Sequence, residues 1–183
     1  MLIAFLADYP ECLPTVAAWI FQEWGLDFAE PSLEEVEAKF RTHLNRDRTP
    51  LTLIALLNDQ PVGTASIFLD DMDTRADLSP WLAAVYVPPE HRSQGIGTCL
   101  VQAIEAVSQQ VGIPRLYLFT HDREAFYARL GWSVLESTEY CHQQVVIMTK
   151  SLSQVKAQKE GTWSCGRLRP ALWDSGRSTA LAS

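Results

Sequence analysis

Hydrophobic and polar positions follow two different periods along the first 150 residues. Segments with apolar residues in short runs or at every second position predict strands, and segments with apolar residues three and four positions apart predict helices. The predicted strands span residues 2–7, 51–57, 61–69, 80–87, 114–120, 132–137 and 143–150. The predicted helices span residues 11–25, 31–44, 96–111 and 123–131.

Two local signals sharpen this pattern. Ser32 lies three residues before Glu35, the spacing of a capping box, which predicts the start of the second helix. The polar segment 58–60 separates two predicted strands and suits a hairpin connection. Because the order β-α-α-β-β-β-α-β-α-β-β mixes hairpins with helical crossovers, we expect an α/β (α+β) fold in which helices cover both faces of one mixed sheet.

The periodicity and the charge of the sequence change after Lys150. Residues 151–183 lack clear periodicity and carry a net charge of +3, which leaves −10 for residues 1–150. We therefore expect a folded domain over residues 1–150 and a C-terminal tail over residues 151–183. Three alternatives stay open for the tail, namely disorder, a recognition extension, or an irregular cap that docks Trp163 and Trp173 on the domain.

Composition argues against several classes of protein. The net charge of −7 disfavours a nucleic-acid partner, because phosphate backbones are normally met by a basic face. No apolar stretch is long enough to span a bilayer, and the N-terminal segment lacks the features of a leader, so we expect a cytoplasmic protein. The four cysteines form no metal-ligand spacing, so we expect reduced thiols and no metal.

A Gly-x-Gly turn opens the predicted third helix within "PPEHRSQGIGTCLVQAIEA", residues 88–106. It is not a P-loop, because Thr98 and Cys99 stand where Lys and then Ser or Thr are required. It is not a dinucleotide fingerprint either, because Leu100 replaces the third glycine. What remains is a loop at a helix N-terminus, where free N–H groups favour an anion such as a pyrophosphate. A plain tight turn is the alternative.

The stretch "VYVPPEHRSQGIGTCLV" resembles the acetyl-CoA signature of the GNAT N-acetyltransferase superfamily. That signature is Arg or Gln, x, x, Gly, x, Gly or Ala after a V-x-P strand end, and Arg92, Gly95 and Gly97 occupy its three diagnostic positions. The resemblance covers residues 1–150, where "PVGTASIFL" and "REAFYARLGW" are also similar to the superfamily, and does not reach the tail. It implies a GNAT-like fold with a mostly antiparallel central sheet, and acetyl-CoA as cosubstrate.

The resemblance also implies where acetyl-CoA binds. The backbone at the strand end, residues 85–87, would form hydrogen bonds with the pantetheine arm. The segment 92–98, called the glycine loop below, would cradle the pyrophosphate. Two central strands would splay apart around the thioester. The cofactor-binding residues implied in this way are Val85, Tyr86, Val87, Arg92, Ser93, Gln94, Gly95, Ile96, Gly97 and Thr98.

Acetyl transfer to an amine requires two proton transfers, since the amine must lose a proton and the departing thiolate must gain one. The resemblance implies Tyr127 as the acid, because members of the superfamily commonly carry there a tyrosine that faces the thiol sulfur. Core packing of Phe126 and Tyr127 is the alternative. Many members have Asn where "THDREAFY" has Asp122, which leaves the role of Asp122 open.

The identity of the base stays open. An α-amino group has a pKa of about 8, so roughly a tenth of it is neutral at pH 7, and a substrate of this kind needs little help. His121, at the end of its predicted strand, is the candidate base, acting directly or through water. Glu23 is a second candidate, and a surface or structural role is the alternative for both residues.

The acidic segment "DDMDTRADLSPW" lies between predicted strands and is expected to form one wall of the acceptor site. Asp70, Asp71 and Asp73 would attract a cationic amine, and Trp81 would add apolar surface. A solvated turn is the alternative for the loop, and core burial is the alternative for Trp81. The segment "THDREAFYARLG" is also similar to the corresponding part of the actin N-terminal acetyltransferase, which indicates a peptide N-terminus as one acceptor, and a small cationic amine is the alternative.

Together these observations predict an N-acetyltransferase that moves an acetyl group from acetyl-CoA to a primary amine by direct transfer through a tetrahedral intermediate, without a metal. The alternative is a non-catalytic acyl-CoA-binding or sensor domain, which would keep the glycine loop and show no turnover. The oligomeric state is open, a homodimer included.

Overall fold

The computed structural model describes residues 1–25, 32–152 and 163–164, and the predicted strands and helices are confirmed. The strands are β1 (Leu2–Phe5), β2 (Leu51–Leu57), β3 (Gln60–Phe68), β4 (Trp81–Tyr86), β5 (Arg115–Thr120), β6 (Ser133–Tyr140), β7 (Gln143–Ser151) and β8 (Trp163–Ser164). The helices are α1 (Leu13–Trp24), α2 (Leu33–Arg41), α3 (Ile96–Gln110) and α4 (Glu124–Arg129). Short 3-10 turns are η1 (Leu6–Asp8), η2 (Pro10–Cys12), η3 (Asp73–Arg75) and η4 (Pro89–His91).

Local chemistry explains where these elements begin and turn. The Glu35 backbone N–H donates to Ser32 Oγ over 3.2 Å, which confirms the predicted cap of α2. Asn58 and Asp59, with φ of 50° and 61°, form the predicted connection between β2 and β3. Both residue types tolerate the left-handed region because a short polar side chain bonds locally.

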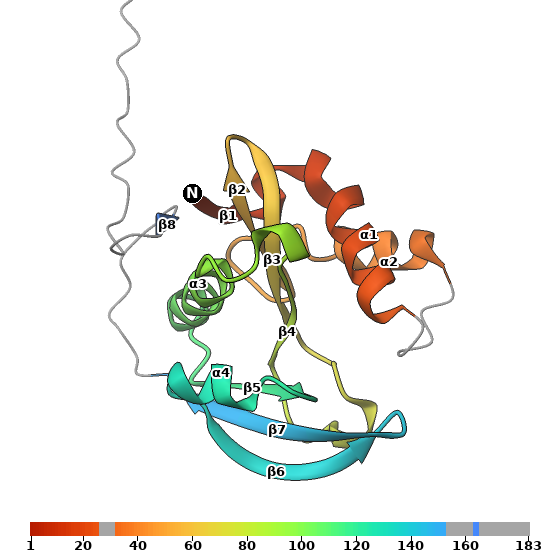
Figure 1. Cartoon of the computed structure of the whole chain (residues 1–183), viewed down its shortest axis with the longest axis vertical. Helices are drawn as coiled ribbons and strands as arrows, with labels where there is room; N and C mark the ends of the chain where they lie inside the picture. The colour runs from red at the N-terminus through yellow and green to blue at the C-terminus, as the bar shows by residue number, and fades with distance from the viewer. Residues whose placement is uncertain (26–31, 153–162, 165–183) are drawn as a thin grey trace, which may run out of the picture.

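The strands form one sheet in the order β6-β7-β5-β4-β3-β2-β1-β8 (Figure 1). Neighbouring strands run antiparallel except β4 and β5, which are parallel. The predicted mixed, mostly antiparallel sheet is therefore confirmed.

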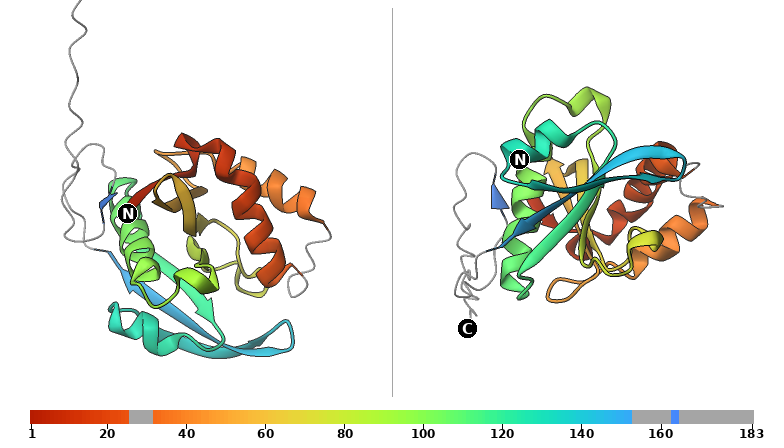
Figure 2. Two further views of the ribbon diagram at one scale, coloured as in Figure 1. Left: turned by 45° about the horizontal axis from the view of Figure 1, so that its top comes forward. Right: turned by 90° about the horizontal axis from the view of Figure 1, so that it is seen from below.

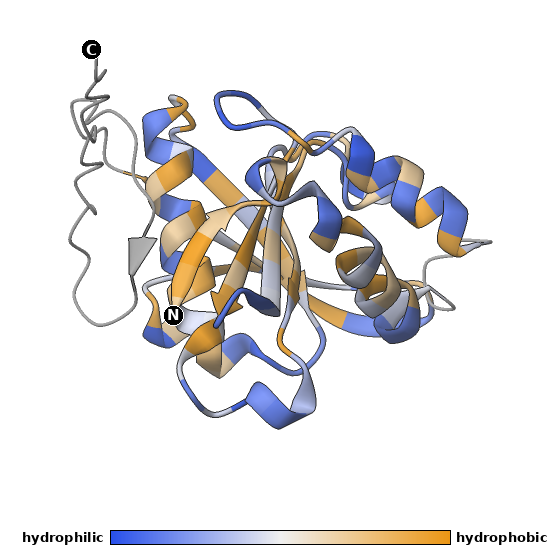
Figure 3. Ribbon diagram, turned by 90° about the horizontal axis from the view of Figure 1, so that it is seen from above, coloured by the Kyte–Doolittle hydropathy of each residue, from blue (hydrophilic) through white to orange (hydrophobic). Residues whose placement is uncertain are grey.

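Helices cover both faces of the sheet, as predicted (Figure 2). On one face, Leu100 and Ile104 of α3 pack in an apolar cluster with strand residues. On the other face, Val16 of α1 and Phe40 of α2 join a second cluster that includes Ile54 of β2. In Figure 3 the central strands are mostly in the orange of hydrophobic residues, whereas orange and blue positions alternate along the helices. Burial of these two clusters holds the helices in place.

The sheet opens between β4 and β5. In the described part of the chain, these strands share a single paired position, Trp81 opposite Tyr117. The register of β4 against β3 also shifts near Ala84, which has a φ of 51°. A bulge of this kind bends a strand and strengthens its twist. The two central strands therefore part after their first residues, as the family resemblance implied.

The tail prediction is only partly covered by the described residues. β8 pairs antiparallel with β1, with Ile3 opposite Trp163. Trp173 lies outside the described residues, so the domain boundary at residue 150 and the role of the tail stay predictions.

One expectation drawn from the cysteines is corrected. Cys12 and Cys141 are free thiols, but Cys99 is disulfide-bonded, so the expectation of reduced thiols is wrong for Cys99. Disulfide pairing depends on how closely two cysteines approach in space, which sequence spacing does not reveal. Over residues 1–25, 32–152 and 163–164, no helix has the length and apolar content of a membrane crossing, and no His, Cys, Asp or Glu group of three or more suits a metal.

Candidate active site

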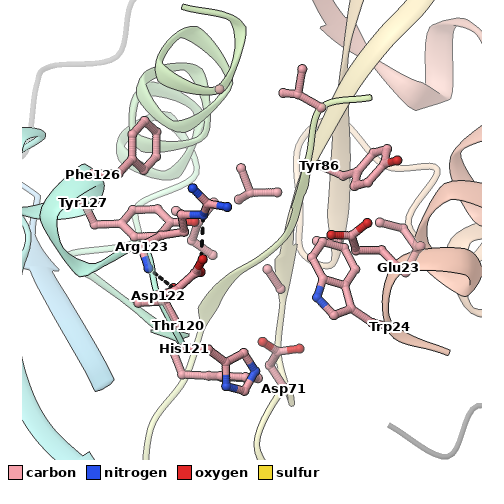
Figure 4. A pocket seen from close by; sticks show the side chains of 18 of the residues that line it. Glu23, Trp24, Asp71, Tyr86, Thr120, His121, Asp122, Arg123, Phe126 and Tyr127 are labelled. Carbon is pink, nitrogen blue, oxygen red and sulfur yellow. Dashed lines mark hydrogen bonds and ion pairs between the residues drawn. The ribbon is translucent and has the colours of Figure 1, made fainter. Parts of the chain in front are cut away.

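A cavity of about 1160 Å³ lies at the opening between β4 and β5. Its walls come from the end of α1, one side of α2, the β3–β4 loop, β4, the glycine loop, the end of β5, α4 and the β6–β7 turn. Figure 4 shows side chains entering it from both sides of the parted strands. A space between splayed strands of a mixed sheet can hold an extended ligand without interrupting the core.

The glycine loop forms one end of the cavity. Gly95 begins α3 with a φ of +80°, and a Cβ placed there would meet no atom within 4 Å. Gly97 lies beside Phe126 of α4, 3.7 Å from where its Cβ would stand. The first N–H groups of α3 have no intrahelical partners and carry the positive end of the helix dipole. This end of the cavity can therefore accept an anionic group close to the backbone.

Arg92 ties the glycine loop to β4. Its Nε donates to the Val87 carbonyl over 2.8 Å, and its guanidinium lies 5.8 Å from the centre of the Tyr86 ring. A longer contact of 3.9 Å joins it to Glu23 of α1. The Arg92 side chain thus braces the loop against β4.

Nine of the ten residues predicted to bind the cofactor line the cavity. They are Val85, Tyr86, Val87, Arg92, Ser93, Gly95, Ile96, Gly97 and Thr98. Gln94 does not line it, because its Nε2 turns away and donates to the Glu90 carbonyl over 3.3 Å. A contact between the Gln94 side chain and a ligand is therefore not supported.

Tyr127 is buried at the cavity wall. Its ring lies 4.9 Å from that of Phe126 and 6.1 Å from that of Trp132, centre to centre. Burial raises the pKa of the Tyr127 phenol above its usual value, with a smaller opposing effect from Arg123. The phenol therefore keeps its proton at neutral pH and can act as a donor.

His121 lines the same cavity from the chain that follows β5. Its side chain is exposed, and its ring lies 6.3 Å from that of Phe119. In Figure 4 the imidazole and the Asp71 carboxylate enter the cavity from different elements, below Tyr127.

The β3–β4 loop brings Asp70, Asp71 and Asp73 to the cavity, as the sequence predicted. Asp70 and Asp73 are exposed, whereas Asp71 is half-buried. Desolvation raises the pKa of Asp71 to about 7, against a smaller lowering by Lys39. Asp71 is thus partly protonated at neutral pH, which sets it apart from an ordinary surface aspartate.

Trp81 is not part of the cavity wall. Its side chain is fully buried, its indole N–H donates to the Leu78 carbonyl over 2.8 Å, and its ring packs against Tyr117 and Phe119. The expectation that Trp81 contacts the acceptor is therefore not supported. Alternation along β4 turns this residue into the core, which was the alternative interpretation.

Several wall residues had no signal in the sequence. Lys39 lies over the Phe68 ring at 4.9 Å, and Tyr140 and Cys141 reach the cavity from the β6–β7 turn. Arg123, which precedes α4, and Arg129 of α4 also line it. Helical periodicity could place Lys39 on a face of α2, but only the packing of α2 against the sheet brings that face to the cavity.

Comparisons with known proteins point to one family. The family model described as the acetyltransferase (GNAT) family matches residues 8–132. N-alpha-acetyltransferase 80 of Mus musculus is 34% identical over 98 residues, which cover 51% of this chain and 31% of that protein. The chain therefore matches about a third of the length of this relative.

Three solved structures share the fold. Aminoglycoside 6'-acetyltransferase type Ii has a TM-score of 0.66 at 20% identity and covers 85% of this chain and 100% of that one. An aminoglycoside 6'-N-acetyltransferase complexed with coenzyme A has a TM-score of 0.67 at 15% identity, with coverage of 85% and 99%. An N-acetyltransferase, PaiA of Thermoplasma acidophilum, in complex with coenzyme A has a TM-score of 0.60 at 21% identity, with coverage of 82% and 99%.

Proposed function

The chain belongs to the acetyltransferase (GNAT) family, and from this premise we propose that it acetylates the α-amino group of a peptide or a small cationic amine. Membership makes it an acetyl-CoA-dependent N-acetyltransferase, a transferase of the EC 2.3.1 type. The nature of the acceptor, the residues that bind each substrate and the residues that move protons are the content of the proposal.

The glycine loop fits the pyrophosphate of acetyl-CoA. A Cβ at Gly95 would meet no atom within 4 Å, and the N–H groups of the first turn of α3 follow directly in the chain. The backbone of Val85 to Val87, freed from β5 by the parting of the strands, would bond the pantetheine arm. When bound, acetyl-CoA supplies a thioester whose carbonyl carbon is open to an amine.

Tyr127 supplies the proton that the departing sulfur needs. The phenol lines the cavity, stays protonated at neutral pH because burial raises its pKa, and lies on α4, which packs beside the glycine loop. A group of this kind typically contributes a factor of about 10² to 10⁴ in rate. His121 lines the cavity near the acceptor side and stays a candidate base.

The charges around the cavity carry the proposal for a cationic acceptor. The β3–β4 loop, with Asp70, Asp71 and Asp73, precedes β4, whereas the glycine loop with Arg92 follows it. The six residues of β4 separate these loops by roughly 20 Å at about 3.3 Å per residue. One end of the cavity therefore suits an anion and the other a cationic amine.

An α-amino group is the favoured acceptor within this class. The relative from Mus musculus is named an N-alpha-acetyltransferase, and its identity of 34% covers half of the chain. An α-amino group with a pKa of about 8 is also readily deprotonated near neutral pH.

A panel of acceptors tests the proposal. Peptides with a free or blocked N-terminus, small diamines and amines that bear a carboxylate are incubated with acetyl-CoA, and acetylated products are measured by mass spectrometry. We expect acetylation of free N-termini, with KM rising when a carboxylate lies beside the amine. Equal rates for free and blocked peptides would refute the α-amino acceptor, and preference for carboxylate-bearing amines would refute a cationic one.

A further inference from the structure

The carboxylates that line the cavity differ in their partners. Glu23 lies 3.9 Å from Arg92, and Asp122 lies 3.3 Å from Arg123. Asp70 and Asp73 are exposed to solvent. Asp71 alone among the carboxylates that the described residues bring to this cavity is at least half-buried and has neither a hydrogen bond nor an ion pair with another described residue.

We propose that Asp71 is the general base that takes a proton from the ammonium group of the acceptor. The inference rests on the proposed function, since it assigns a residue to the reaction at that same site. Asp71 lies on the loop that precedes β4, at the acceptor end of the cavity, and its carboxylate points into the cavity in Figure 4. A base must reach the nitrogen before chemistry, and a carboxylate without a partner is free to do so.

The groups that share the cavity with Asp71 come from every element packed around it. They are Lys39 of α2, Glu23 of α1, Asp70 and Asp73 of the same loop, Tyr86 of β4, His91 and Arg92 before α3, His121, Asp122 and Arg123 after β5, Tyr127 and Arg129 of α4, Tyr140 at the end of β6, and Cys141 after it. Lys39 opposes protonation of Asp71, but desolvation is the larger effect and raises the pKa to about 7. Burial, with a contribution from Asp73, raises the pKa of Tyr140 to about 12, so this phenol stays neutral.

A carboxylate with a pKa near 7 is matched to its task. An ordinary aspartate near 3.9 would accept a proton from an amine of pKa about 8 only weakly. A base whose pKa lies near the working pH combines a useful ionised fraction with a stronger pull on the proton. Asp70 and Asp73, on the same loop, are exposed to solvent.

Acetyl transfer involves two acceptors for the protons that leave the nitrogen and one change of bond at the acetyl carbon. The ammonium gives one proton to Asp71, and the nitrogen lone pair forms the bond to the acetyl carbon. The carbon–sulfur bond breaks, its electrons stay on sulfur, and Tyr127 protonates that sulfur. The second proton of the nitrogen restores the phenol, and the proton on Asp71 leaves to solvent.

The test compares pH profiles with two acceptor amines that differ in pKa by about 2 units, chosen from the class that the wild type acetylates. If Asp71 deprotonates the bound ammonium, the acidic limb of kcat/KM falls near pH 7 with both amines. In Asp71→Asn the limb should follow the pKa of each amine, and kcat/KM at pH 7 should fall roughly 100-fold or more. Asp59→Asn, at the exposed β2–β3 turn outside the cavity, is the matched control and should keep the wild-type profile.

Two results would overturn the inference. A wild-type limb that already follows the amine pKa excludes Asp71 as the base without any variant. A limb retained in Asp71→Asn but lost in His121→Gln would assign the role to His121 instead. Calorimetry with acetyl-CoA should give the same Kd for Asp71→Asn and the wild type, which separates chemistry from cofactor binding. Loss of the proposed function itself looks different, since the wild type would then acetylate no amine of the acceptor panel.

Discussion

Replacing Asp71 by Asn should stabilise the fold, and more so at high pH. The folded-state pKa of Asp71 is about 7, roughly 3 units above that of an unfolded aspartate. Between about pH 4 and 7 the folded chain therefore holds a proton that the unfolded chain has lost, so stability falls as pH rises through this window. Asparagine has a similar shape and no charge to desolvate, and it escapes that loss.

The magnitude follows from the shift. At about 1.4 kcal/mol per pKa unit, ionising Asp71 in the folded state costs up to roughly 4 kcal/mol of unfolding free energy well above pH 7, an upper bound because cavity water solvates part of the charge. At pH 5, about one pKa unit above the unfolded-state pKa, only about 1.4 kcal/mol of this cost applies. The gain from Asp71→Asn should therefore be roughly 2–3 kcal/mol larger at pH 8 than at pH 5.

Urea unfolding at pH 5 and pH 8 measures this difference, with the denaturation midpoint converted through a common slope. The exposed residue Asp70 offers the matched control, because Asp70→Asn should change stability by the same small amount at both pH values. An equal effect of Asp71→Asn at pH 5 and pH 8 would show that its carboxyl titrates as an ordinary aspartate. Asp71 would then lack the raised pKa that suits a base near neutral pH.

Three further outcomes are expected at the same cavity. Gly95→Asp should weaken CoA binding at least 10-fold by calorimetry, because it places a carboxylate at the end of the cavity that suits an anion. Gly112→Asp changes a glycine of similar positive φ outside the cavity and should leave the Kd for CoA unchanged. Tyr127→Phe should lower kcat by roughly 10 to 1000-fold at constant acetyl-CoA Kd, and an unchanged kcat with rate-limiting chemistry would reduce Tyr127 to a packing role. The double change Asp70→Asn and Asp73→Asn should raise KM for a cationic amine and flatten the salt dependence of that KM, since exposed charges act over about 10 Å at 0.1 M salt. If KM changes with salt in the same way in the wild type and the double variant, the loop is only a solvated turn.

The order of strands and helices could be predicted because each carries its own period. β2 and β3 are apolar runs on either side of a polar turn, and Ser32 marks the start of α2. The glycine loop could be predicted because its chemistry is local, with Gly95 at a backbone angle that other residues rarely adopt.

The acceptor side could not be predicted to the same depth, because it is assembled from segments far apart in the chain. Alternation along β4 does not tell which face meets the cavity, and Trp81 turned out to lie in the core. The sequence does not distinguish Asp71 from Asp70 and Asp73, because burial depends on how the loop packs. Only the packing around the β3–β4 loop desolvates Asp71 and leaves the other two in water.

Following one acetyl group shows whether this chain acetylates an α-amino group. Acetyl-CoA with a heavy-isotope acetyl group is mixed with the wild type and two peptides of the same sequence, one with a free and one with a blocked N-terminus, and each product is located by fragment mass spectrometry. We expect the label to move to the α-nitrogen of the free peptide alone, and Tyr127→Phe to slow this transfer. Label that stays on CoA, reaches only side-chain amines, or appears equally on the blocked peptide would contradict this expectation.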